Sequence, residues 1–448
     1  MNPSELPDPP GPRGGIPLRR LLAFRRDPLR FLDDVHRTYG DVAHFRLGPR
    51  RFYVLSHPED VRDVLVANHR NFIKSLALQR ARTLLGQGLL TSEGEHHLRQ
   101  RRLAQPAFHR DRVAAMAEAM VRRAAGVADV WRAGATLHVG REMNRLTLGI
   151  AGETMFGAEV DAEAEEIGRA LTDALGLFRR LSNPLGPLLD RIPVPGTIRF
   201  RRARERLDAT IHRLVEARRA ASGDRGDLLS MLLSARDEEG DGTGMTDAQL
   251  RDELLTIFLA GHETTANALA WSWHLLGANP GAEAALHAEI DSVLGGRLPT
   301  AADLPALPYS RGVMAEAMRL FPPAWAIGRQ PLEDFAAAGL RVQAGSVVLL
   351  CPWIVHRDPR WWPDADAFRP ERWSTAAEAE QPRFAYFPFG GGPRKCIGEG
   401  FAWTEGTLVL ATIARRWRLR PVAEGAPQTE PLITLRARGL RMAVEARA

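Results

Sequence analysis

One long apolar helix, predicted between residues 246 and 277, constrains the fold more than any other feature. The segment Thr246-Asp-Ala-Gln249 has the pattern of a capping box, and Gly277 followed by Pro280 provides a stop signal. The roughly thirty residues between them would span about 45 Å at 1.5 Å per residue. A helix this long and this apolar runs through the centre of a protein, so the sequence predicts a large, mainly helical fold built around it.

Composition excludes several classes of protein. With 45% hydrophobic and 25% charged residues, the 448-residue chain is typical of a folded globular protein. The net charge of +6 comes from arginines scattered among acidic residues. This pattern does not predict nucleic-acid binding, although some arginines are candidates for a face that docks an acidic partner. The sequence has no signal peptide and no long apolar run, so we expect a cytoplasmic protein without a membrane span.

The remaining patterns predict further helices and two regions rich in strands. A hairpin is expected at 44–55, more strands at 339–350, an apolar loop with glycines at 75–91, and a long coil at 356–373. Helices are expected at 60–65, 94–108, 116–131, 146–156, 162–178, 200–219, 282–294, 310–320 and 398–415.

The chain has two cysteines, which excludes a disulfide framework and a four-cysteine zinc site. Cys351 lies in an apolar run and is expected to be a buried core residue. Cys396 lies in Phe387-Pro-Phe-Gly-Gly-Gly-Pro-Arg-Lys-Cys396-Ile-Gly398, where Arg394, Lys395 and the start of the next helix favour a thiolate. Since no second ligand stands at zinc spacing, the other metal ligands must come from a cofactor, and haem supplies four nitrogens. The alternative is a nucleotide-binding glycine loop, but its strand, loop and helix order is missing.

The segment Ala260-Gly-His-Glu-Thr-Thr265 lies halfway along the long apolar helix. Glycine costs about 1 kcal/mol relative to alanine inside a helix, threonine bends the turn, and a buried carboxylate costs more still. We therefore expect the helix to open locally, with water or oxygen bound there. The alternative is a simple polar cluster at a helix crossing.

Together these segments resemble the motifs of the cytochrome P450 superfamily, in the same order, from about Tyr39 to near the C-terminus. The haem-binding signature Phe-x-x-Gly-x-Arg-x-Cys-x-Gly matches, and so does the acid–alcohol pair of the long helix. A third motif is Glu316-Ala-Met-Arg319, which the resemblance joins to Arg372 in Phe368-Arg-Pro-Glu-Arg372-Trp373 as a structural triad. Trp373 replaces the usual phenylalanine. The signature positions are Phe389, Gly392, Arg394, Cys396 and Gly398.

The resemblance implies a mainly α fold, in which a large helical lobe and a smaller β-rich lobe enclose haem b (iron protoporphyrin IX). Residues 1–38 would form a proline-rich lead-in with the first helix, and 39–448 a single catalytic domain. Cys396 would bind the iron, with Phe389 packed near its sulfur. Thr264 would hold oxygen and its proton donor, and Glu263 would relay protons. The implied partners of the haem propionates are His97, Arg101, Arg329 and Arg394.

The implied function is a monooxygenase that inserts one atom of O₂ into an apolar molecule of secondary metabolism, by hydroxylation or epoxidation. Terpenoid, fatty acyl and polyketide substrates all remain open. Electrons would come from a separate ferredoxin or flavodoxin-type donor with its reductase, and the enzyme is expected to be a monomer. The alternative is a haem-thiolate protein that does not oxygenate, either a ligand sensor or a peroxide isomerase. The residues expected in the substrate pocket are Leu84, Leu89, Phe178, Phe258, Ala260, Trp325, Ile327 and Ile433.

Overall fold

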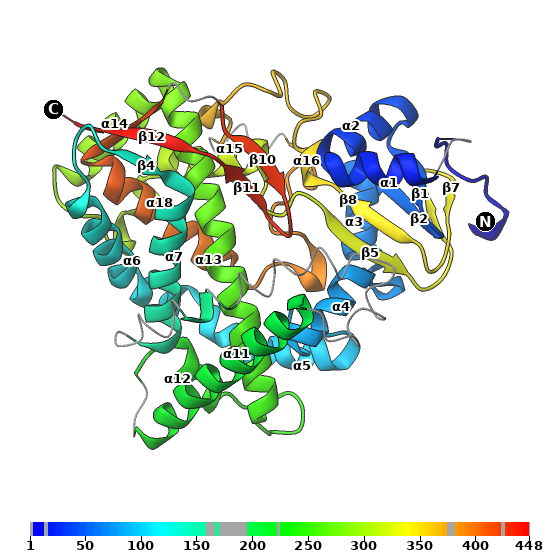
Figure 1. Ribbon diagram of the computed structural model, residues 1–448, viewed down its shortest axis with the longest axis horizontal. Coiled ribbons are helices and arrows are strands. Elements are labelled where there is room, and N and C mark those ends of the chain that lie inside the picture. The colour runs from blue at the N-terminus through cyan, green and yellow to red at the C-terminus, as the bar shows by residue number, and fades with distance from the viewer. Residues whose placement is uncertain are drawn as a thin grey trace.

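The fold consists of a large helical lobe and a smaller lobe built on a sheet, as the computed structural model in Figure 1 shows. This arrangement confirms the predicted fold class. The structure describes residues 3–12, 17–157, 166–168, 170, 195–221, 225–373, 381–422 and 426–447.

The central element is α13, Asp247–Ala278, which matches the predicted long helix. Its capping box is complete, because the Thr246 hydroxyl accepts from the Gln249 amide (3.3 Å) and the Gln249 side chain accepts from the Thr246 amide (2.9 Å). The helix is uninterrupted, so the expected local opening at 260–265 is not present. The hydroxyls of Thr264 and Thr265 donate to the carbonyls of Ala260 and Gly261 one turn earlier, which satisfies these two hydroxyls without breaking the helix.

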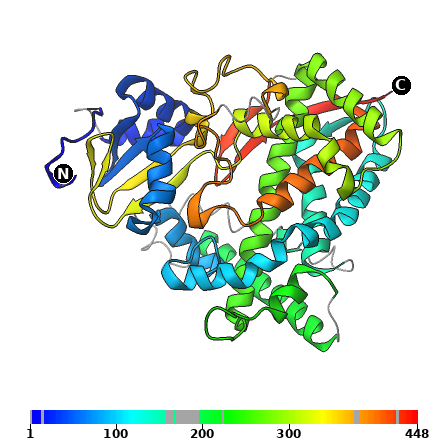
Figure 2. The ribbon, with the colours of Figure 1, turned by 180° about the vertical axis from the view of Figure 1, so that it is seen from behind.

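Several helices pack around α13 to form the large lobe. The Thr147 hydroxyl of α7 donates to the carbonyl of His262 in α13 at 2.9 Å. On the opposite side of the molecule, α18 lies along α6 (Figure 2). The helices are α5 (Gly94–Ala104), α6 (Arg110–Val130), α7 (Val139–Phe156), α11 (Pro195–Ala220), α12 (Leu228–Ser234), α14 (Pro280–Leu294), α15 (Pro308–Leu320) and α18 (Glu399–Ala414).

The smaller lobe contains a five-stranded sheet in the order β1-β2-β8-β5-β3, in which only the β2–β8 pair is parallel. The predicted hairpin is its β1–β2 pair. Two helices, rather than one, precede the sheet, and the lead-in joins the lobe through a bond from the His44 amide to the Pro10 carbonyl (2.9 Å). The elements are α1 (Pro17–Arg26), α2 (Pro28–Tyr39), α3 (Pro58–Arg62), α16 (Pro352–Val355), β1 (Val42–Leu47), β2 (Arg50–Leu55), β3 (Phe72–Lys74), β5 (Ile327–Pro331) and β8 (Val347–Leu350).

The expectation that residues 75–91 form a loop is wrong over its first part, because Leu76–Leu85 is helix α4. Ala81, Leu84 and Leu85 recur at helical spacing and are buried against α13, and Gly86 ends the helix.

Three small sheets complete the fold in the part of the chain that the structure describes, in the orders β4-β12-β9, β10-β11 and β6-β7. Their strands are β4 (Thr136–His138), β6 (Phe335–Ala337), β7 (Leu340–Val342), β9 (Trp417–Pro421), β10 (Gln428–Pro431), β11 (Leu435–Arg438) and β12 (Arg441–Ala446).

Candidate functional site

The loop that carries Cys396 is held in a tight conformation just before α18. Gly392 has φ +65°, and a Cβ at that position would lie 2.0 Å from the Leu65 carbonyl oxygen, so only glycine fits. The Cys396 amide donates to the Phe389 carbonyl at 2.9 Å, and the Gly398 amide donates to the cysteine sulfur. Gly398 is also the N-cap of α18, which places the sulfur at a helix N-terminus as predicted.

The Cys396 side chain lies deep in the protein and is nevertheless accessible. Burial raises the pKa of its thiol, yet its surface is exposed. Helix α13 also has accessible residues in its middle, because Ala260 is exposed and Gly261 and Thr264 are half-buried, whereas the other residues of 254–270 are buried. A Cβ added to Gly261 would meet no atom within 4 Å. The cysteine loop and the middle of α13 therefore both present accessible groups inside the molecule, namely the Cys396 thiol and the surface at Ala260 and Thr264. A flat cofactor can fit against these groups.

Cationic side chains gather beside the cysteine loop. Lys74 and Arg329 pair across β3 and β5, and both are buried. Burial and nearby positive charges lower the pKa of Lys74 well below its usual value and that of Arg329 to about 10. His97 on α5 is affected in the same way, because burial together with Arg394, Lys74 and Arg101 lowers its pKa to about 3.

One carboxylate, Glu93, offsets part of this positive charge. It accepts from the Lys74 amide at 2.6 Å and pairs with Arg394. Arg394 also donates to the Ser92 carbonyl (2.6 Å), and Arg101 donates to the Lys395 carbonyl (2.8 Å). Lys74 and Glu93 were not among the residues predicted from the sequence. The only sequence feature that could have drawn attention to this cluster is Lys74, which is one of the chain's two lysines and lies in a β-prone run.

These residues fit haem. A thiol that is accessible inside the protein can bind the iron, and a cluster of cations with excess positive charge can bind two propionates. The open face of α13 at Ala260 and Gly261 leaves room for the apolar macrocycle. The structure thus brings together the predicted partners Cys396, His97, Arg101, Arg329 and Arg394.

Glu263 and Thr264 point in different directions. The Thr264 hydroxyl donates to the Ala260 carbonyl at 2.7 Å on the accessible face of α13. Glu263 is buried and is held by the Thr434 hydroxyl (2.7 Å) and the Arg436 Nε (2.7 Å). Arg436 is one-third exposed, so this ion pair links the interior to the surface. No local pattern could reveal Thr434 and Arg436, because they come from the distant β10–β11 hairpin.

The predicted triad residues meet in the core. Arg319 makes a bidentate ion pair with Glu316, with both distances at 2.8 Å, and both side chains are fully buried. The Arg372 Nε lies 3.3 Å from the same carboxylate. Trp373 donates its indole N–H to Glu316 at 3.0 Å, a hydrogen bond that a phenylalanine cannot make. Arg319 also donates to three carbonyls of the 356–373 coil, those of His356, Ala365 and Ala367.

Some expected pocket residues lie on accessible surface and others do not. Leu89, Trp325 and Ile327 are half-buried, and Ile433 is 36% exposed. Trp325 also donates to the Leu432 carbonyl at 2.9 Å, which ties two of the expected pocket segments together. The structure does not bring two other residues to the Thr264 face, because Phe258 packs in the core against Phe156 and His262, and Leu84 is buried in the same cluster. Phe178 lies outside the described residues.

Glu405 on α18 is a buried carboxyl that was not predicted from the sequence. It is fully buried close to the Thr265 hydroxyl, which donates to the Gly261 carbonyl at 3.3 Å. Burial raises the pKa of this carboxyl from 4.5 to about 8, and the nearby Thr265 hydroxyl offsets only part of the rise. Such a group stabilises the fold at low pH and loses that contribution as the pH rises toward 8.

We therefore expect Glu405→Gln to flatten the pH dependence of stability. Between about pH 5 and pH 8, the wild-type free energy of unfolding should fall relative to the variant by up to about 4 kcal/mol, since one pKa unit corresponds to about 1.4 kcal/mol. Urea unfolding of both proteins across this range measures the difference. Parallel pH profiles would show that Glu405 does not titrate in this way.

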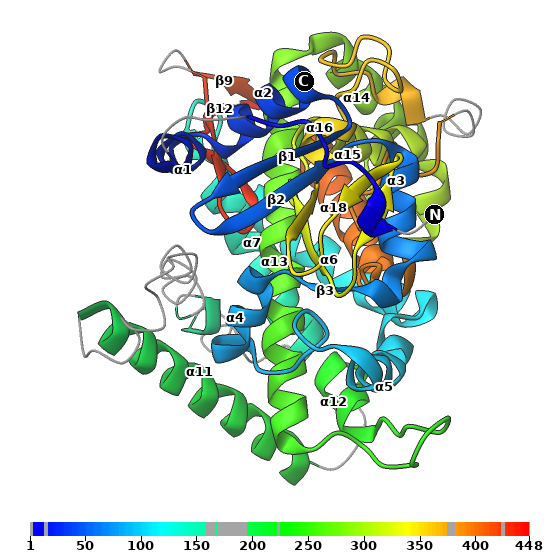
Figure 3. The same cartoon turned by 90° about the vertical axis from the view of Figure 1, so that its right-hand side faces the viewer.

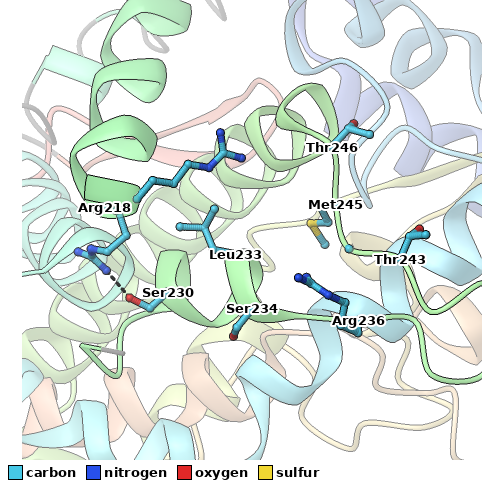
Figure 4. Close-up of a pocket in the computed structure, with 10 residues that line it drawn as sticks. Arg218, Ser230, Leu233, Ser234, Arg236, Thr243, Met245 and Thr246 are labelled. Atoms are coloured by element: carbon cyan, nitrogen blue, oxygen red, sulfur yellow. Dashed lines mark hydrogen bonds between the residues drawn. The ribbon is translucent and has the colours of Figure 1, made fainter. Parts of the chain in front are cut away.

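A surface cavity of about 860 Å³ lies apart from this site, between α11, α12 and the segment before α13 (Figure 4). The side chains of Arg218 and Arg219 line it, but Asp227 and Asp247 neutralise them. No residue of the cysteine loop or of the 260–265 segment lines this cavity. It is therefore not the pocket predicted from the sequence.

Within the described part of the chain, no helix has the length and apolarity needed to cross a membrane.

Cys351 is fully buried, as predicted, and burial raises the pKa of its thiol above the usual range. Cys396 is thus the cysteine available to a ligand.

Comparison with known proteins agrees with the site. The chain is 44% identical to cyclooctatin synthase from Streptomyces melanosporofaciens, over 97% of this chain and 95% of that protein. It is 42% identical to cyclooctat-9-en-7-ol 5-monooxygenase from the same organism, with 91% and 89% covered. It is 37% identical to pentalenene oxygenase from Streptomyces avermitilis, with 97% and 96% covered. The cytochrome P450 family model matches residues 9–441. The chain therefore belongs to the cytochrome P450 family, and it is a monooxygenase.

Proposed function

We propose that this monooxygenase hydroxylates or epoxidises a terpenoid of secondary metabolism. The observation that carries the proposal is an accessible Cys396 thiol beside a cation cluster with excess positive charge. The choice of a terpenoid rests on the names of the related enzymes, two of which refer to cyclooctatin chemistry and one to pentalenene. The apolar, accessible residues Leu89, Ile327 and Ile433 suit such a substrate better than a charged one.

Each part of the site has a distinct task. Haem b, when bound, supplies the chemistry that activates O₂. Cys396 would hold its iron, and His97, Arg101, Arg329 and Arg394, together with Lys74, would hold its propionates. The Thr264 hydroxyl would hold a proton at the accessible face of α13, and Glu263 would supply protons from the surface once Arg436 releases its carboxylate.

Electrons would come from a separate ferredoxin or flavodoxin-type protein in the cytoplasm. The surface beside the cysteine loop offers Lys395, whose side chain is about half exposed and pairs with Glu399. A small acidic partner can compete for this lysine. The docking surface would then lie close to Cys396 in sequence and in space, and the enzyme would act as a monomer.

The test is reconstitution with a ferredoxin and its reductase, cyclic terpene hydrocarbons as substrates, and isotopically labelled dioxygen. We expect one labelled oxygen atom in the product and the other in water. Thr264→Ala should lower the product formed per electron consumed by roughly tenfold or more, because proton transfer by a positioned group contributes at least this much. Thr265→Ala is the matched control on the next residue. If no terpene acquires label, the proposed substrate class is wrong, and if coupling in Thr264→Ala is unchanged, the proposed role of the Thr264 hydroxyl is wrong.

A further inference from the structure

Three side chains of α14 form a row on one face of this helix. Glu283, His287 and Asp291 follow each other at intervals of four residues, and Glu283 and His287 are buried. Figure 3 shows α14 together with β9 and β12 at the upper end of α13, opposite α11 and α12. The row meets arginines of β9 and of the segment that follows β12, and none of these residues belongs to the proposed haem site.

Carboxylates and arginines are paired at both ends of the row. Arg420 of β9 donates to both carboxylate oxygens of Glu283, at 2.9 and 2.7 Å, and its Nε donates to Glu445 of β12 at 3.1 Å. Arg447 donates to the Asp291 carboxylate at 2.6 Å. The charges at the two ends are therefore compensated within the protein.

The middle of the row contains donors without acceptors. Arg418 lies two residues before Arg420 on β9, so both side chains leave the strand on the same side. Among the described residues, no carboxylate lies within ion-pair distance of Arg418, and its buried Nε has no hydrogen-bond partner. The buried Nε of Arg447 and both ring nitrogens of His287 also lack a partner in this part of the chain. These four buried nitrogens indicate that an acceptor is missing.

The electrostatics of His287 show what kind of acceptor is missing. Burial, followed by the charges of Arg447 and Arg418, lowers the pKa of His287 from 6.5 to about 4, although Asp291 raises it. The imidazole is therefore neutral at pH 7, and Arg418 has no counter-charge. A water molecule can accept hydrogen bonds at this position, but it cannot neutralise the arginine. An anion with several oxygens does both.

We propose that His287, Arg418 and Arg447 form a binding site for a phosphate group between α14 and the β9–β12 pair. The donors come from three segments of the chain, which suits a tetrahedral anion with oxygens on every side better than a planar carboxylate. The Arg418 guanidinium can hold two phosphate oxygens through its parallel N–H groups, and His287 can donate to a third. The ligand is either free phosphate or the phosphate group of a small metabolite.

The acids around this site leave it open to an anion. The side chains of Asp291 and Glu445 are 61% and 52% exposed, so they can turn into solvent. Glu283 is buried, but Arg420 holds both of its oxygens. A bound phosphate would join α14 to β9 and β12, so we expect it to stabilise the folded protein.

Calorimetric titration of the haem-loaded protein with inorganic phosphate, at constant ionic strength, measures the site directly. We expect one phosphate per chain, with half-saturation at about 1 mM or below. Arg418→Leu and His287→Leu should each weaken binding about tenfold or more, because each removes a donor that no other group replaces. Titration with AMP then separates the two sources of the ligand. Tighter binding of AMP than of inorganic phosphate assigns the site to a phosphorylated metabolite, and weaker binding assigns it to the free ion.

The matched control is Arg416→Leu, which removes a neighbouring arginine that pairs with Asp129 instead. It should bind phosphate as the wild type does. The proposal fails if the wild type shows no binding up to about 20 mM phosphate, or if Arg418→Leu and His287→Leu bind phosphate as tightly as Arg416→Leu. Arg418→Leu keeps His287 and every carboxylate, so it decides the matter even if His287→Leu folds poorly.

Thermal unfolding separates an anion site from a purely structural arginine. Without phosphate, Arg418→Leu should unfold at the same temperature as the wild type or at a higher one, because it removes an unpaired cation. With phosphate, the wild type should gain more stability than Arg418→Leu. The general stabilising effect of phosphate on proteins is the same in the Arg416→Leu control and therefore cancels. If Arg418→Leu is less stable than the wild type by the same amount in both buffers, Arg418 has only a structural role and the proposal is wrong.

Discussion

Serine in place of Cys396 is expected to remove the red-shifted Soret band that a thiolate ligand gives the reduced carbon monoxide complex, and to reduce turnover to background. The serine hydroxyl stays protonated and is a weak iron ligand, whereas the cysteine sulfur already accepts the Gly398 amide and lies at a helix N-terminus. Loss of an outer-shell partner of a metal ligand typically costs about 10- to 100-fold. Loss of the ligand itself should cost more.

This variant also separates the ligand from the rest of the haem site. The cation cluster remains in Cys396→Ser, so we expect substantial haem to be retained, as a pyridine haemochrome assay would measure. Cys351→Ala is the matched control, since that thiol is fully buried and should leave the spectrum unchanged. A normal thiolate spectrum in Cys396→Ser would overturn the assignment of the iron ligand. Its loss in Cys351→Ala alone would point to the other cysteine.

Local patterns predicted the elements whose signals lie within a few residues of each other. The capping box of α13, the β1–β2 hairpin and the cysteine loop before α18 all formed as expected. Each depends on short-range chemistry, namely a cap, a turn or a glycine that must approach another backbone. The same kind of pattern was present in α4, where the period of Ala81, Leu84 and Leu85 outweighed the glycines that follow.

Residue spacing also predicts which side chains share one face of a helix. Applied to α13, it corrects the expectation that Phe258 lines the substrate pocket. Phe258 lies six residues before Thr264, which places the two side chains more than a quarter turn apart on α13. The structure accordingly packs Phe258 against Phe156, while Thr264 stays accessible. Helical spacing applied residue by residue would have kept Ala260 and rejected Phe258.

Long-range pairs could not be predicted in this way. The partner of Glu263 is Arg436, far along the chain, and Lys74 meets Arg329 only because β3 and β5 are adjacent in the sheet. The residues that surround a buried charge depend on topology, which residue spacing does not contain. The family resemblance supplied the positions of His97, Arg101 and Arg329, but it gave no indication of Lys74.

The second large effect is expected at Arg319. Arg319→Ala removes the bidentate partner of Glu316 and leaves a buried carboxylate with one arginine at 3.3 Å. Breaking a buried ion pair from one side costs about 3–5 kcal/mol. The carbonyls of His356, Ala365 and Ala367 lose their donor as well. We expect little folded protein and almost no bound haem, measured as soluble yield and haem per chain.

Three further variants separate the causes of that loss. Trp373→Phe removes one hydrogen bond to Glu316 and should cost about 1–3 kcal/mol in urea unfolding. Arg297→Ala breaks a half-exposed pair with Asp303 and should change the stability much less than either core variant, because solvent screens the pair. The decisive comparison is Glu316→Met with Arg319→Met, which leaves no unpaired charge between these two residues. If the unpaired Glu316 carboxylate causes the loss of stability in Arg319→Ala, the double variant will be more stable than Arg319→Ala. If the two are equally unstable, the cause is the loss of the hydrogen bonds from Arg319 to the 356–373 coil.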